Sequence, residues 1–292
     1  MAANPGSPLT SPGPPELARL RRGPARDLLA GQLVAIGALL ALAAVAWVVT
    51  DLRMAGMDMG PGTDPGAFGF YISTWVVMMA AMMFPSIAPM VLMYRNVQRG
   101  RRARGTAGAR GTTILFVAGY LLVWGASGVL GYAVLKAGRA WAGDVFAWHS
   151  AGRWTAVAVI AAAAAYEFTS LKGACLTRCR GPLAFILGNW RDGRLGAIEM
   201  GTEHGLWCIG CCWALMAALF ALGAMSIAWM LVIGALIAAE KLLPWRGTAV
   251  TAVAVVLAAL AIGVALAPDR VPALTVPGGA STSSMSMSTS MH

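Results

Sequence analysis

Seven segments of this chain are each long and apolar enough to cross a lipid bilayer, and this limits the fold more than any other feature. Crossing about 30 Å of hydrocarbon takes a helix of about 20 residues. With 58% apolar residues, 12% charged residues and a mean hydropathy of +0.69, a water-soluble globular surface is excluded. The chain is predicted to be an integral membrane protein. The expected spans are residues 28–49, 70–94, 112–135, 154–171, 198–222, 225–243 and 248–267.

The spans are predicted to be helices. Their Ala, Leu, Val and Ile runs lack the two-residue alternation of a membrane barrel strand and are too long for one. The predicted fold class is therefore all-α, a polytopic transmembrane bundle of about seven helices.

The distribution of basic residues predicts a cytoplasmic N-terminus and an outer C-terminus. With that orientation, 17 of the 22 Lys and Arg residues flank the spans on the inner side and five lie outside. Lys and Arg in short loops are retained in the cytoplasm. The same distribution explains the net charge of +10, so no nucleic-acid partner is expected. The lipid bilayer of the inner (plasma) membrane is the expected surrounding.

Three regions are predicted along the chain. Residues 1–27 are expected to form a disordered cytosolic tail, residues 28–267 the transmembrane helical domain, and residues 268–292 a disordered outer tail rich in Met and Ser. The first span follows a basic stretch like a signal sequence, but its length favours an uncleaved anchor.

Three of the five cysteines stand close together in the fifth span. Cys208, Cys211 and Cys212 follow His204 at helical spacing. On a helical wheel His204, Cys208 and Cys211 lie near one line with Met200, and Cys212 is displaced by about 80°. Thiolate, imidazole and thioether ligands suit Cu(I), and zinc is a possible alternative. Packing as small apolar side chains is the alternative for any one cysteine alone.

The other two cysteines, Cys175 and Cys179, lie just cytoplasmic of the fourth span and share a face if that helix continues. The cytosol keeps such thiols reduced. Two acids near inner span ends, Glu167 and Glu240, are further candidates because an acid in a span is functional by default. For Glu240 the alternatives are pairing with Lys241 and reaching the interface.

Methionines dominate the second span and the first outer loop. Met78, Met79, Met82 and Met83 lie in one sector of the second helix. Pro85 and Pro89 are expected to kink or locally open it. In the loop, Met57 and Met59 flank Asp58. Soft thioethers suit Cu(I), whereas packing against neighbouring helices or lipid is the alternative.

The predicted topology places methionines towards the outside and cysteines towards the inside. Thioethers do not form disulfides outside the cell, and thiols stay reduced in the cytosol. This asymmetry favours a soft metal, most simply Cu(I), that is captured by outer methionines and held by inner sulfur ligands.

Three stretches carry a resemblance to a known family. They are WVVMMAAMMFPSIAPM (75–90), KGACLTRCRGP (172–182) and GTEHGLWCIGCCWALM (201–216). Together they resemble the bacterial family of predicted metal-binding integral membrane proteins, a family of unknown function, over about residues 57–241. The resemblance implies metal binding and nothing about turnover.

Three interpretations remain open. The first is a non-enzymatic protein that binds and traffics copper, with a metallochaperone or metalloenzyme as a candidate partner. The second is a thiol-disulfide membrane oxidoreductase that uses Cys175 and Cys179 with the fifth-span cysteines, although these face the reducing side. The third is a structural or assembly partner of a metalloenzyme, in which the cysteines pack.

Overall fold

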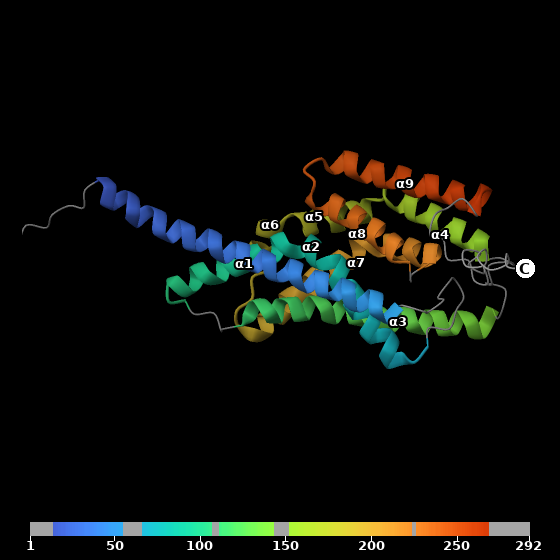
Figure 1. The fold of residues 1–292 in the computed structure, drawn as a ribbon, viewed down its shortest axis with the longest axis horizontal. Coiled ribbons are helices and arrows are strands. Elements are labelled where there is room, and N and C mark those ends of the chain that lie inside the picture. The colour runs from blue at the N-terminus through green and yellow to red at the C-terminus, as the bar shows by residue number, and fades with distance from the viewer. Residues whose placement is uncertain (1–13, 55–65, 107–110, 143–151, 224–225, 269–292) are drawn as a thin grey trace, which may run out of the picture.

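The computed structural model describes residues 14–54, 66–106, 111–142, 152–223 and 226–268. Over these residues the chain forms helices and no strand, which confirms the predicted all-α class. The longer helices lie roughly along one common axis, as expected for a membrane bundle (Figure 1). The helices are α1 (Pro14–Met54), α2 (Phe68–Ala103), α3 (Thr112–Ala142), α4 (Arg153–Tyr166), α5 (Ser170–Arg180), α6 (Pro182–Gly188), α7 (Gly193–Gly223), α8 (Ile227–Leu242) and α9 (Arg246–Leu266).

Five helices are long and apolar enough to cross a membrane: α1 from Leu29 onward, α2, α3, α7 and α9. They correspond to five of the seven predicted spans. Helix α1 begins at Pro14, well before the expected start of its span, and its N-terminal part projects beyond the other helices (Figure 1). Residues 1–13 and 269–292 lie outside the described part of the chain.

The fourth predicted span is not one straight helix. It is divided into α4 and α5, which meet at an angle of 66°. The two helices are long and apolar enough to cross a membrane only when they are taken together. The break occurs because Thr169 adopts an extended backbone and its side chain accepts a hydrogen bond from the Lys172 amide, so that it caps a new helix. The expected continuous helix over 154–171 was therefore wrong.

The sixth predicted span is shorter than expected. Helix α8 has 16 residues, which is about 24 Å at 1.5 Å per residue and less than the hydrocarbon thickness. Ser226 caps its first turn by accepting from the Trp229 amide. The described residues thus contain five spans, or six with the bent α4–α5 pair, in place of the seven expected.

The prolines of the second span do not interrupt it. Helix α2 continues through Pro85 and Pro89 from Phe68 to Ala103. The expected local opening is absent from this described helix, and the break in the bundle falls instead between α4 and α5. The hydroxyl of Ser86 donates to the Met83 carbonyl at 2.9 Å. Phe84, Ser86 and Ile87 around Pro85 are buried, and their packing supports the helix where the proline ring removes a backbone donor.

Glycines bring α3 and α7 into close contact. A Cβ atom at Gly119 would lie 2.3 Å from the Ile198 carbonyl oxygen, and one at Gly201 would lie 2.0 Å from the Phe116 carbonyl oxygen. Small residues let membrane helices approach in this way, which increases their dispersion contact where no hydrophobic effect drives association. The close approach carries the side chain of Tyr120 on α3 to the middle of α7.

Adding a methyl group at Gly201 is expected to separate these two helices. In Gly201→Ala the new carbon meets a backbone oxygen that no side-chain rotation can move. Overpacking of this kind costs about 1–3 kcal/mol. Thermal unfolding of the detergent-solubilised protein, followed by tryptophan fluorescence, should show a lower Tm.

Gly138→Ala, on α3, the helix that Gly201 contacts, is the control because nothing lies within 4 Å of its added Cβ. Its Tm should be unchanged or slightly higher, since alanine favours a helix by about 1 kcal/mol over glycine. Equal Tm values for Gly201→Ala and the unsubstituted protein would contradict the close-packing account.

Candidate metal centre

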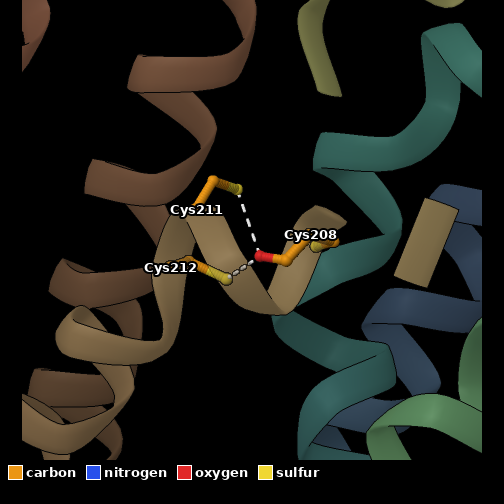
Figure 2. Close-up of side chains that lie close together, drawn as sticks. All are labelled: Cys208, Cys211 and Cys212. Atoms are coloured by element: carbon orange, nitrogen blue, oxygen red, sulfur yellow. Dashed lines mark hydrogen bonds between the residues drawn. The ribbon is translucent and has the colours of Figure 1, made fainter. Parts of the chain in front are cut away.

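Three sulfur atoms converge on one turn of α7. The Sγ atoms of Cys208, Cys211 and Cys212, here called the cysteine cluster, all lie within 4.8 Å of one another. All three side chains are buried. The thiols of Cys211 and Cys212 both point toward the Cys208 carbonyl oxygen, to which they donate at 3.1 and 2.9 Å (Figure 2). Residues three and four positions apart share a helix face, so one turn of backbone suffices to gather the three sulfurs.

The members of this group differ from the helical-wheel expectation. Cys212, which the wheel displaced, belongs to the group, and His204 does not. The ring of His204 lies among Phe185, Tyr120 and Phe116, with centroid distances of 5.3, 5.9 and 6.2 Å. Its Nδ1 atom is buried and has no hydrogen-bond partner among the described residues. A helical wheel gives the angular position of a residue but not its side-chain rotamer. The rotamer of Cys212 turns its sulfur toward those of Cys208 and Cys211. A ligand role for His204 stays a prediction.

Helix α5 adds a fourth sulfur to the edge of the cluster. The Sγ atoms of Cys179 and Cys211 are 3.7 Å apart. Cys175, one turn earlier on α5, is buried against α7 at Gly210, where an added Cβ would lie 2.6 Å from its Sγ. The two cysteines expected to act together thus meet different residues of α7: Cys179 faces a cluster sulfur and Cys175 fills the space above a glycine.

Cys208 has two polar neighbours from other helices. The Lys241 ammonium at the end of α8 donates to its Sγ at 2.9 Å, and the Tyr120 hydroxyl of α3 lies 3.0 Å from the same atom. The thiolate is the form of cysteine that binds metals. An ammonium and a phenol at hydrogen-bonding distance stabilise a negative charge on this sulfur.

A buried ion network lies beside the cluster. Lys172 on α5 donates to Glu167, in the break after α4, and to Glu240 on α8 at 2.8 Å. All three side chains are at most 2% exposed. The expected alternative of a Glu240–Lys241 pair is not found in the described chain, because Glu240 turns to Lys172 and Lys241 turns to Cys208. The network ties α5 to α8 and so fixes the two helices that flank the cluster.

The methionines of the second span are buried in the core. Met78, Met79, Met82 and Met83 are each at most 5% exposed. Met82 packs on α8, where its Cγ and Cε lie 3.7 Å from the position of a Cβ on Gly234. Met57 and Met59 lie outside the described residues. Ligand roles for all of these methionines stay predictions.

Three residues of the site were not identified from the sequence: Tyr120, Lys172 and Lys241. A signal was present for the lysines, because a charged side chain inside an apolar stretch is costly and is usually retained for a partner. Their partners could not be read from the chain, since Lys172 and Glu240 are 68 positions apart. Tyr120 carried no signal beyond being an aromatic residue in a span.

The possible metal ligands at this site are soft sulfur atoms that lie close together. Three thiol sulfurs lie within bonding reach of one ion and a fourth is next to them. Thiolates suit Cu(I), which accepts few sulfur ligands, whereas structural zinc takes four tetrahedral ligands. Three buried sulfurs with one more at the edge form a soft donor set for either ion.

Comparison with known proteins gives one match. The sequence model of the PpoB2 family, described as a copper chaperone, matches residues 72–264 and so covers α3 to α9 and nearly all of α2. No curated protein and no solved structure matches the chain. The family match confirms the metal-related family that the sequence resemblance implied.

Lys172→Met should destabilise the protein strongly. The substitution leaves two buried carboxylates without their cation, and removal of one member of a buried ion network costs about 3–5 kcal/mol. We expect a lower Tm and a lower yield of monodisperse protein by size-exclusion chromatography. The triple variant Lys172→Met, Glu167→Gln, Glu240→Gln removes all three charges and should recover most of the loss. A triple variant as unstable as Lys172→Met would argue against the charge imbalance as the cause.

Proposed function

Because the chain belongs to the PpoB2 family of copper chaperones, we propose that it carries Cu(I) as cargo within the membrane and passes it to another protein. The observation that supports this most directly is the cysteine cluster, with three buried sulfurs within 4.8 Å of one another. We assign the cargo site to Cys208, Cys211 and Cys212. The protein acts as a binding and delivery protein and not as an enzyme.

The surroundings of the cluster suit a monovalent soft ion. Two or three thiolates around one Cu(I) carry a net negative charge, and a buried net charge is costly unless a partner compensates it. Lys241, at 2.9 Å from the Cys208 sulfur, supplies a positive charge there. Burial also keeps water and oxidants from the sulfurs, which protects a cuprous ion and its ligands.

We propose that the methionines bind copper before it reaches the cysteine cluster. Met78, Met79, Met82 and Met83 place soft thioethers inside the bundle on α2, which packs against α8, the helix that carries Lys241. We propose that Met57 and Met59 capture copper on the outer side of the inner (plasma) membrane and that the α2 methionines carry it inward. The charge distribution of the loops supports this direction. A soluble metallochaperone or a metalloenzyme is the proposed recipient.

A second candidate function is thiol-disulfide exchange. The observation in its favour is the 3.7 Å separation of the Cys179 and Cys211 sulfurs, which are close enough to join with a small movement. Trapping a stable mixed disulfide between one of these thiols and another protein would support it. The reducing environment predicted for this end of the bundle weighs against it.

Copper binding is tested on the full chain in detergent under anaerobic, reducing conditions. The unsubstituted protein should retain about one Cu(I) per chain after desalting, as one site of three thiols holds one ion. Cys208→Ser and Cys211→Ser should each lower the affinity by at least about tenfold, since each removes a thiolate ligand. The measurement is competition with a chromogenic Cu(I) chelator.

Cys175→Ser is the matched control, because its sulfur packs on Gly210 and is not a member of the cysteine cluster. It should bind copper as the unsubstituted protein does. Equal copper affinity in Cys208→Ser, Cys211→Ser and Cys175→Ser would refute the assigned site, and no copper in any of the proteins would refute the proposed cargo.

A further inference from the structure

Cys179 differs from the other cysteines in its exposure. Cys175, Cys208, Cys211 and Cys212 are buried, and Cys179 is half-buried. Its sulfur also lies 3.7 Å from a cluster sulfur, that of Cys211. Cys179 is therefore the member of the four-sulfur group that lies nearest the surface of the described chain, while the residues of the other three sulfurs are buried.

The surroundings of Cys179 show that this edge faces water or lipid headgroups. Its neighbours in sequence are Arg178, which is exposed, and Arg180. The Arg178 guanidinium lies 4.5 Å from the centre of the Trp207 ring on α7. An exposed arginine in hydrocarbon is costly, and an arginine stacked on a tryptophan is typical of the membrane interface. The half-buried Cys179 thus lies at the interface end of the bundle.

The end of α5 is held in place by contacts from two other helices. Arg180 donates to the Glu240 carbonyl of α8 at 2.5 Å and to the Leu243 carbonyl beyond it. Arg246 of α9 donates to the Thr177 hydroxyl at 2.7 Å and to the Gly173 carbonyl at 2.8 Å. These bonds fix Cys179 beside Cys211, so its position is part of the fold and not the chance placement of a surface residue.

We propose that Cys179 is the exchange ligand through which Cu(I) moves between the buried cysteine cluster and a thiol-bearing partner. This inference rests on the proposed copper cargo. Cys208, Cys211 and Cys212 hold the ion at rest, and Cys179 binds it only during transfer. The partner recognised here is a protein that presents its own thiolate ligands at the membrane surface.

The transfer is a ligand exchange without redox change. A bond from copper to the Cys179 sulfur forms as the bond to Cys211 breaks. Partner thiolates then replace the Cys208 and Cys212 sulfurs one at a time, and the bond to Cys179 breaks last, as the copper leaves with the partner. Copper stays in the cuprous state throughout. Each incoming thiol gives up its proton as it binds, and each released thiolate takes up one, so protons and charge balance overall.

The test separates transfer from storage. Full-length protein in detergent is loaded anaerobically with one equivalent of Cu(I) and mixed with excess glutathione, and the released copper is captured by a chromogenic chelator. Cys179→Ser should keep the copper content and affinity of the unsubstituted protein. Its rate of copper release should fall by at least about tenfold, because it lacks the intermediate ligand. Cys175→Ser, one turn earlier on the same helix, should release at the unsubstituted rate.

Two results would overturn the exchange role while leaving the copper cargo intact. One is an unchanged release rate in Cys179→Ser. The other is a loss of copper from Cys179→Ser as complete as that from Cys208→Ser, which would make Cys179 a resting ligand. An unsubstituted protein that binds no Cu(I) would refute the cargo itself.

A second measurement needs no substitution. A water-soluble maleimide should alkylate Cys179 before the other four cysteines, and mass spectrometry of the digested protein measures this order. Loading with Cu(I) should not change the order, because the resting ion is not bound to Cys179. Earlier labelling of a cluster cysteine would overturn the proposal.

Discussion

The site depends on the buried ion pairs that Lys172 makes with two carboxylates. Lys172 joins Glu167 in the break between α4 and α5 to Glu240 on α8. Without this link two carboxylates and an ammonium would be left unpaired in an apolar interior, at a cost of several kcal/mol. With it, α5 is fixed against α8. Cys179 is thereby held next to the cluster, and Lys241 follows Glu240 into contact with Cys208.

The cysteine cluster combines a local and a non-local part. The three sulfurs of α7 come together within a single helical turn, and the Cys208 carbonyl orients two of them. The groups that adjust their chemistry come from elsewhere: a phenol from α3, an ammonium from α8 and a fourth sulfur from α5. A copper carrier needs both parts, since it must hold a soft ion firmly and still release it to a partner.

Sequence reasoning succeeded where a property belongs to one helix and failed where it depends on how helices meet. The spacing of Cys208 and Cys211 was sufficient to predict that their sulfurs lie close together, although the helical wheel displaced Cys212. The break at Thr169 was missed because the hydrogen bond that caps α5 is a small local signal within a segment long enough to be read as one helix. His204 was grouped with the cysteines by angle alone, and its ring instead packs among aromatic side chains of neighbouring elements.

The sequence by itself determined that this is an all-α membrane protein and that its second and fifth predicted spans carry groups of sulfur side chains. Both follow from periodicity and from the cost of leaving backbone polar groups unpaired in lipid. Only the tertiary structure decided that Cys179 lies next to the cluster, that Cys175 packs on Gly210, and that Lys241 donates to Cys208. Those pairings depend on glycine contacts and on one buried ion network between residues far apart in the chain, and no local pattern encodes which distant partner a side chain will meet.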